Sequence, residues 1–176
     1  MKKCLPGILL TLFLFSCNVE TQREEVDNGR DLKVEQKLME INKYMVKRNR
    51  ELFENFIRRT GWEMERIAAG VWYGPVEYGS GLKPEEGDLV LISYELKLLD
   101  GKNIMSVPPS NPETFVLGKS EVISGLEKGV SRMRENERAR LILSPQAAYG
   151  TFGDMEEIPP SAILIFQIHL LKVKKI

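Results

Sequence analysis

The chain has little of what several classes of protein require. Its 176 residues include one histidine and two cysteines, too few soft ligands for a zinc site. The 25 basic and 25 acidic side chains cancel, whereas a protein that binds nucleic acid needs a basic face to neutralise phosphates. Asp154, Glu156 and Glu157 lack the spacing of a calcium loop. No serine or cysteine lies in a nucleophile context, so His169 is expected at an exposed or edge position of a strand. We therefore expect no nucleic-acid partner, no metal and no cofactor.

The chain does have the composition of a globular protein. It is 43% hydrophobic and 28% charged, which excludes wholesale disorder. Domains cluster near ~100–150 residues, so the length allows one domain and an additional segment.

The N-terminal residues resemble a bacterial lipoprotein signal. Lys2 and Lys3 form a basic start, and the apolar stretch of residues 5–15 is far too short to span a bilayer. Ser16 then precedes Cys17, and in such signals a small residue stands before a cysteine that is acylated. The resemblance implies that residues 1–16 are removed and that Cys17 carries lipid, palmitate included. The alternative is a buried N-terminal strand with a free Cys17, which would not need the Lys-Lys start.

The polar residues 17–32 have almost nothing to bury, so we expect a flexible tether that holds the domain off a membrane. Cys4 leaves with the signal and Cys17 carries lipid, so no disulfide is expected. By analogy with better-known bacteria, Asn18 directs the protein to the outer membrane. These features predict a lipid-anchored protein of the cell envelope.

An apolar stripe at helical spacing predicts one long amphipathic helix over residues 33–60, ending at Gly61. The stripe consists of Val34, Leu38, Ile41, Met45, Leu52, Phe53, Phe56 and Ile57. Its partner is either the chain's own domain or a second copy of the helix in a homodimer, and the spacing leaves both open. Arg48 and Asn49 interrupt the stripe, which weakens a regular coiled coil. We expect the domain to stay folded without residues 33–59, because its core is assembled from its own strands.

After Gly70 the hydrophobic period changes to two, which predicts strands. The expected strands are residues 89–98, ending at the Asp100-Gly101 turn, 115–117, closed by Gly118, 138–144 and 162–173. Residues 121–133 show helical spacing, broken by Gly125 and Gly129. The pattern predicts an α+β domain over residues 61–176, a mostly antiparallel sheet with one short helix lying on it.

A series of motifs in this domain is shared, as a series, with a known protein family. The match runs over residues 70–174 in the right order. Its parts are Val122-Ile123-Ser124-Gly125-Leu126-Glu127-Lys128-Gly129, Ser144-Pro145 with Ala148-Tyr149-Gly150, Ile158-Pro159-Pro160-Ser161-Ala162, Gly87-Asp88, Tyr94 and Asp100-Gly101-Lys102. In this order the motifs resemble the FK506-binding type of peptidyl-prolyl isomerase. The resemblance implies an antiparallel sheet wrapped around a short helix, and an enzyme that isomerises Xaa-Pro bonds without a cofactor.

The resemblance also implies a groove for proline-containing polypeptides. The residues expected to be catalytic are Tyr94, Ile123, Tyr149 and Phe166, and those expected to bind substrate are Ile104, Met105, Phe115, Val122, Leu126, Ala148 and Ile158. The backbone N–H of Ile123 and the hydroxyl of Tyr149 are expected to hold substrate carbonyls. Independently of the resemblance, strand alternation puts Tyr94 and Phe166 on faces that point the same way.

Three positions depart from the family pattern. Ile104-Met105 stands where the best-known members have Phe-Asp, so the aspartate credited with polarising the substrate is missing. Leu126 stands where many members have tryptophan, and Glu113 where an aromatic residue is common.

The resemblance implies a weakened isomerase that assists folding of envelope or secreted proteins. Two other readings stay open: a non-catalytic chaperone that binds extended chains in the same groove, and a structural subunit of an envelope machine.

The order of signal, helix, Gly61-Trp62-Glu63-Met64 and domain resembles membrane-anchored members from Bacteroidetes-type bacteria. These include the gliding-motility-associated lipoproteins.

Overall fold

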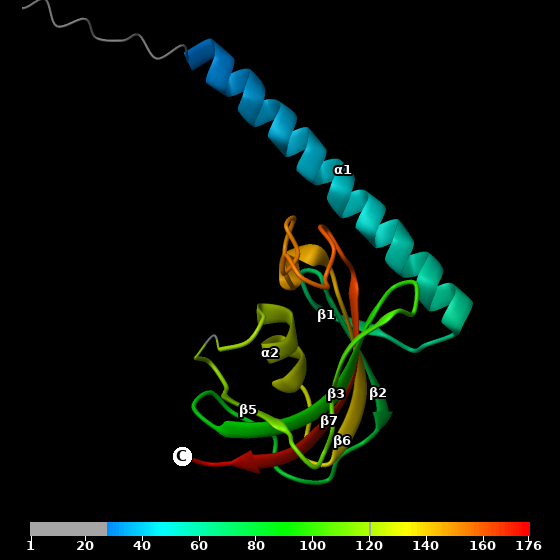
Figure 1. Cartoon of the computed structure of the whole chain (residues 1–176), viewed down its shortest axis with the longest axis vertical. Coiled ribbons are helices and arrows are strands. Elements are labelled where there is room, and N and C mark those ends of the chain that lie inside the picture. The colour runs from blue at the N-terminus through cyan, green and yellow to red at the C-terminus, as the bar shows by residue number, and fades with distance from the viewer. Residues whose placement is uncertain (1–27, 120) are drawn as a thin grey trace, which may run out of the picture. The chain divides into compact units, whose positions relative to one another are not determined.

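A computed structural model describes residues 28–119 and 121–176 of the chain (Figure 1). It begins with α1 (Asn28–Thr60), which starts earlier than the predicted residue 33. Residues Asn42–Ile176 form one compact unit, and the helical residues up to Ile41 belong to another. The expected signal, Cys17 and most of the expected tether lie outside the described residues. Within the described residues, no helix is both long and apolar enough to cross a membrane.

The C-terminal end of α1 lies where the sequence predicts it. Gly61 has a φ of +67°, and its N–H donates to the Ile57 carbonyl at 2.9 Å. Glycine adopts this left-handed conformation without the steric cost of a side chain. Arg58 and Arg59 occupy the last turn, where positive charge is favourable at the negative end of the helix dipole.

The rest of the chain forms a seven-stranded sheet with one short helix against it (Figure 1). The elements are β1 (Glu65–Ala68), β2 (Val71–Glu77), β3 (Leu89–Leu98), β4 (Asn103–Val107), β5 (Glu113–Val116), α2 (Ser124–Val130), β6 (Glu137–Leu143), the single 3₁₀ turn η1 (Pro145–Ala147) and β7 (Leu164–Lys174). The strand order is β1-β2-β6-β7-β3-β4, and β5 also pairs with β3. Every one of these pairings is antiparallel. The predicted α+β fold is confirmed.

Two glycines allow α2 to lie close to β6. A Cβ added to Gly129 would lie 2.2 Å from a methyl carbon of Leu141 on β6, and one added to Gly125 would lie 2.7 Å from a methyl carbon of Leu143 on β6 and 2.6 Å from the Ala147 carbonyl oxygen of η1. The glycines that interrupt the helical pattern in the sequence are therefore required by the close packing. The main core lies between α2 and the sheet and includes Val90, Ile92, Leu96, Leu126, Val130, Met133, Leu141, Leu143, Leu164 and Phe166.

A second, smaller core involves the last part of α1. Phe53 and Phe56 are 0% and 9% exposed and pack with residues of β6, of β7 and of the segment before β7. The cluster includes Ile142 of β6, Ile163 before β7 and Ile165 of β7, with Trp62, Met64 and Trp72 packed against them. Here the helix packs on its own domain, as one of the two sequence readings predicts. The main core contains no described residue of α1, whereas removal of residues 33–59 would uncover this second cluster, so folding of the domain without the helix stays a prediction.

His169 lies in β7, which is an interior strand between β6 and β3. Its Cα partners are Ser93 on β3 and Arg138 on β6, and its side chain is partly buried. Burial and the positive charge of Arg138 lower the pKa of the imidazole. The predicted exposed or edge position is therefore wrong, since both edges of β7 are paired.

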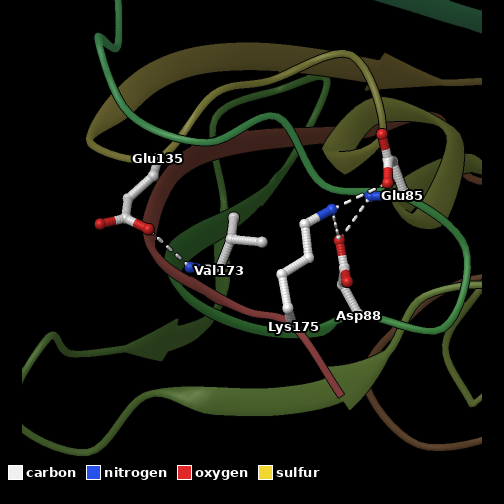
Figure 2. A network of polar contacts seen from close by, with 5 residues as sticks. All are labelled: Glu85, Asp88, Glu135, Val173 and Lys175. Carbon is white, nitrogen blue, oxygen red and sulfur yellow. Dashed lines mark hydrogen bonds and ion pairs between the residues drawn. The ribbon is translucent and has the colours of Figure 1, made fainter.

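Charged side chains hold the C-terminal end of β7 (Figure 2). The Lys175 ammonium lies 2.8 Å from Asp88 Oδ2 and 2.9 Å from Glu85 Oε2. The Val173 N–H donates to Glu135 Oε2 at 3.0 Å. These contacts fix the end of a strand that also lines the cavity described next.

Candidate active site

A cavity of about 550 Å³ lies between the sheet and the start of α2, a volume in the range of small-ligand pockets. Its lining combines apolar side chains with two tyrosines and two carboxylates. The lining residues are Tyr94, Leu96, Met105, Glu113, Glu121, Val122, Ile123, Leu126, Tyr149 and Phe166.

Strand alternation and register build the sheet side of the cavity. Tyr94 and Leu96 lie on one face of β3, and Leu96 has Phe166 of β7 as its Cα partner on one side and Met105 of β4 on the other. Directly paired residues point to the same face of a sheet, so these side chains converge. The Tyr94 and Phe166 rings have centroids 5.3 Å apart and planes inclined at 57°. The prediction that they point the same way is confirmed.

The start of α2 forms the facing wall. Ile123 is the residue before the helix, with φ −58° and ψ 139°. Its carbonyl accepts hydrogen bonds from the N–H groups of Leu126 at 3.0 Å and Glu127 at 3.2 Å. The first turn of α2 therefore holds the Ile123–Ser124 peptide, while Val122 and Leu126 contribute apolar side chains to the lining of the cavity.

Tyr149 comes from the loop that follows η1 and is 38% exposed. The Gly150 N–H donates to the Pro145 carbonyl at 2.7 Å, which closes the turn that carries the tyrosine. Burial raises the pKa of the Tyr149 hydroxyl, and the negative charges of Asp154 and Glu113 raise it further. The hydroxyl therefore stays protonated and can donate a hydrogen bond into the cavity.

Tyr94 makes a hydrogen bond that the sequence did not predict. Its hydroxyl lies 2.6 Å from Glu113 Oε2 and 3.4 Å from the Met105 sulfur. Burial raises the pKa of the Tyr94 hydroxyl far above its ordinary value, and the Glu113 carboxylate adds to this effect. The hydroxyl is the donor and Glu113 the acceptor.

Comparisons with known proteins agree with this geometry. A family model described as FKBP-type peptidyl-prolyl cis-trans isomerase matches residues 81–171. The chain belongs to this family. Peptidyl-prolyl cis-trans isomerase Fkbp12 of Drosophila melanogaster is 40% identical over 107 residues, which cover 60% of this chain and 99% of that protein. FKBP1A of Xenopus laevis is 39% identical over 107 residues, again 60% of this chain and 99% of the relative.

Solved structures show the same fold. A peptidyl-prolyl cis-trans isomerase from Pseudomonas syringae has a TM-score of 0.64 at 27% identity, covering 76% of this chain and 96% of the other. The N-terminal domain of FKBP42 from Arabidopsis thaliana has a TM-score of 0.60 at 24% identity, covering 64% and 93%, and bears on the fold alone. The chain is thus an FKBP-type enzyme whose described domain is preceded by a long helix.

Seven of the predicted site residues meet at the cavity of this FKBP-type domain. They are Tyr94, Met105, Val122, Ile123, Leu126, Tyr149 and Phe166. Four others do not line it. Phe115 and Ile158 are 2% and 4% exposed and belong to the main core, while Ile104 and Ala148 are partly buried against that core. Their contact with substrate stays a prediction.

Three lining residues were not predicted as site residues. Leu96 follows Tyr94 at the strand period of two, so alternation alone pointed to it. Glu113 is the first residue of β5 and Glu121 follows this strand, so their approach to the cavity depends on how β5 pairs with β3. The Glu121 carboxylate accepts a hydrogen bond from the Val116 N–H at 3.0 Å, which ties it to β5.

The cavity has the properties that prolyl isomerisation needs. Rotation about an Xaa-Pro bond meets a barrier of ~18–20 kcal/mol because of amide resonance. The planar amide is more charge-separated than the twisted one, so removal of water by an apolar cavity disfavours the planar ground state relative to the transition state. No covalent intermediate is required. The Tyr149 hydroxyl is protonated and can donate to a carbonyl group in the cavity, whereas the Tyr94 proton is already donated to Glu113.

Proposed function

We propose that this cavity is the site at which the protein isomerises Xaa-Pro bonds. The proline ring lies against Phe166, Val122 and Leu126, and the Ile123 N–H and the Tyr149 hydroxyl hold the adjacent carbonyls. The observation that carries the proposal is one cavity with an apolar floor and the Tyr149 hydroxyl on its lining. Desolvation by the floor lowers the rotational barrier, while the donors align the backbone.

A protease-coupled assay on residues 18–176 tests this proposal. The protein is added to a peptide with an apolar residue before proline, because Val122, Ile123 and Leu126 present an apolar surface there. We expect modest catalysis above the spontaneous rate, since Met105 replaces an aspartate. An unchanged rate, with the peptide still bound, would leave the non-catalytic chaperone as the function.

The chaperone alternative rests on the same replacement of the aspartate by Met105. It predicts suppression of aggregation of an unfolded, proline-containing client with no acceleration of its proline-limited refolding phase. An isomerase accelerates that phase. A protein that does neither would be left with a structural role in the envelope.

We also propose that the protein acts at the cell envelope, anchored through lipid on Cys17, on envelope or secreted polypeptides. The Lys2-Lys3 start, the apolar stretch and Ser16-Cys17 support this, and Asn18 favours the outer membrane. Acyl chains contribute about 0.8 kcal/mol per buried CH₂, enough for stable attachment with several chains. Palmitate labelling of wild type, but not of Cys17→Ala, is the expected result. Wild-type protein that takes up no palmitate and does not partition into detergent would contradict the lipid anchor. It would also contradict the likeness to gliding-motility-associated lipoproteins.

The first part of α1 supports a homodimer. Val34, Leu38 and Ile41 recur at helical spacing along one face and are 53%, 55% and 49% exposed. A second copy of the helix would cover such a stripe. Sedimentation of residues 18–176 should give a dimer, and replacing Val34, Leu38 and Ile41 together by serine should give a folded monomer. A monomeric wild type would contradict the proposal.

A further inference from the structure

The cavity of this domain contains a carboxylate supplied by a different strand from the one that the family pattern suggests. Met105 on β4 stands where the best-known members have aspartate, yet Glu113 on β5 accepts the Tyr94 hydroxyl at 2.6 Å. Both strands pair with β3. On β3, Glu113 pairs with Ile92, which lies two residues before Tyr94. Met105 pairs with Leu96, which lies two residues after Tyr94, so the two side chains approach the tyrosine from opposite directions along the strand.

This register gives Glu113 access to the tyrosine. Ile92 and Tyr94 point to the same face because they are two residues apart, and Glu113 shares that face as the partner of Ile92. A diagonal neighbour on a paired strand lies within reach of a long side chain. A partly buried glutamate therefore spans to the hydroxyl of a tyrosine that is 8% exposed.

The charged side chains that line the cavity are all negative. Its charged lining residues in the described part of the chain are Glu113 and Glu121, with no lysine or arginine among them. Asp154 and Glu113 both act on Tyr149 through their negative charge. The second oxygen of Glu113 remains available to a cationic group, because a carboxylate accepts several hydrogen bonds.

We propose that Glu113 is a positioning and specificity-determining residue of this site: it holds the Tyr94 hydroxyl and favours substrates with a basic residue flanking the Xaa-Pro pair. The inference rests on the proposed function of the cavity. The apolar surface of Val122, Ile123 and Leu126 faces the residue before proline, and the carboxylate acts on the positions outside that pair.

Matched peptides test the charge preference. Each keeps leucine before proline and carries either lysine or glutamate at the flanking positions, and the readout is the ratio of their kcat/KM values. We expect wild type to prefer the lysine peptides by about two- to fivefold at low salt, as for a partly exposed ion pair. The ratio should shrink toward one at high salt.

Glu113→Gln keeps an oxygen acceptor for Tyr94 and removes the charge, so it should bring the ratio of kcat/KM between lysine and glutamate peptides close to one. Glu95→Gln is the matched control, because Glu95 adjoins Tyr94 on β3, points to the opposite face and pairs with Lys97 at 2.7 Å. It should leave the ratio intact. An unchanged ratio in Glu113→Gln, or an equal loss in Glu95→Gln, would overturn the proposal.

The positioning role has its own test. Glu113→Leu should lower kcat more than Glu113→Gln does, and the difference should vanish when Tyr94 is phenylalanine. Adding Met105→Asp to Glu113→Leu should restore both kcat and the lysine preference, because it returns a carboxylate to Tyr94 from β4. If this double variant recovers neither, the role of Glu113 is structural only.

Fluorescence anisotropy with the same labelled peptides separates this inference from the proposed function. One outcome is that the wild type does not isomerise the peptides but binds lysine peptides more tightly than glutamate peptides, and that Glu113→Gln loses this difference. This outcome would contradict catalysis and support the charge preference. Catalysis without any charge preference would support the site and overturn the inference. Failure to bind or isomerise either peptide would overturn both.

Discussion

Phe53 of α1 stacks on Trp72 of β2, with ring centroids 3.8 Å apart and planes inclined at 25°. Phe53 is 0% exposed and belongs to the cluster with Ile142 and Ile165. The end of α1 is thus part of the domain's own hydrophobic structure. Helix and sheet are coupled through this contact, on the face of the sheet away from α2.

Replacing Phe53 by alanine should therefore destabilise the domain. Loss of a fully buried aromatic ring costs about 3–5 kcal/mol, which urea unfolding followed by tryptophan fluorescence would measure. Tyr44→Ala is the control, because Tyr44 lies on the same helix and is 64% exposed. Its effect should stay within about 0.5 kcal/mol. Equal effects of the two variants would contradict the packing of α1.

Replacing Phe166 by alanine should reduce both stability and activity, because this residue lines the cavity and is 2% exposed. We expect a loss of about 3–5 kcal/mol in the free energy of unfolding. Phe53→Ala is a matched control, since Phe53 is a similarly buried phenylalanine that does not line the cavity. It should cost similar stability and much less kcat/KM, measured well below the melting temperature. Equal losses of kcat/KM would argue against Phe166 as a substrate contact.

Replacing Tyr149 by phenylalanine removes one hydroxyl and little else. If this hydroxyl donates to a substrate carbonyl, kcat/KM should fall severalfold, corresponding to about 1 kcal/mol. Thermal stability should not change. Tyr78→Phe, at a tyrosine that is 85% exposed, should leave kcat/KM as in wild type. An unaffected Tyr149→Phe enzyme would remove this donor from the mechanism.

The pairing of Lys175 with Asp88 should give stability a defined pH dependence. The Lys175 ammonium, helped by the Glu85 N–H, holds the pKa of Asp88 below its ordinary value. The unfolded state therefore binds this proton more readily, so the contribution is present above about pH 4 and is lost as the pH falls through the folded-state pKa.

Lys175→Met should accordingly lower the melting temperature at neutral pH, and the difference from wild type should shrink as the pH falls below about 4. Calorimetry across this range measures both. The nearby Glu135, whose pKa is also lowered, chiefly by Lys172, is unchanged in the variant and cancels in the comparison. A difference that is constant with pH would show that Lys175 acts through packing and not through its charge.

Strand β3 could be predicted closely from the sequence because its alternation is long and ends at a clear turn, and it spans Leu89–Leu98 as predicted. Strand β2 could not, because Gly74 and Pro75 break its pattern. Proline is tolerated at position 75 for two reasons. The pairing of β2 with β1 does not extend to Pro75, and a bulge follows Pro75 in the pairing of β2 with β6. Gly74 is required because an added Cβ would lie 2.4 Å from the Glu63 carbonyl oxygen.

The cavity could be predicted only in part, because a sequence shows motifs on single elements but not the register between strands. Motifs on single elements, such as Val122-Ile123 and Tyr149, were found from the sequence and lie on the cavity. The Tyr94–Glu113 hydrogen bond joins residues 19 positions apart and depends on the register between β3 and β5. No local pattern encodes that register, so the sequence indicated the loss of an aspartate at Met105 but not the carboxylate that approaches from the other strand.

The most direct test of the central claim is exchange NMR on a Leu-Pro peptide in the presence of residues 18–176. The account predicts cis–trans exchange far faster than the spontaneous process, which takes tens of seconds or longer, and a marked loss of this exchange in Phe166→Ala under conditions where the variant is folded. Exchange that stays at the spontaneous rate while the peptide signals shift on binding would contradict an isomerase site in this cavity.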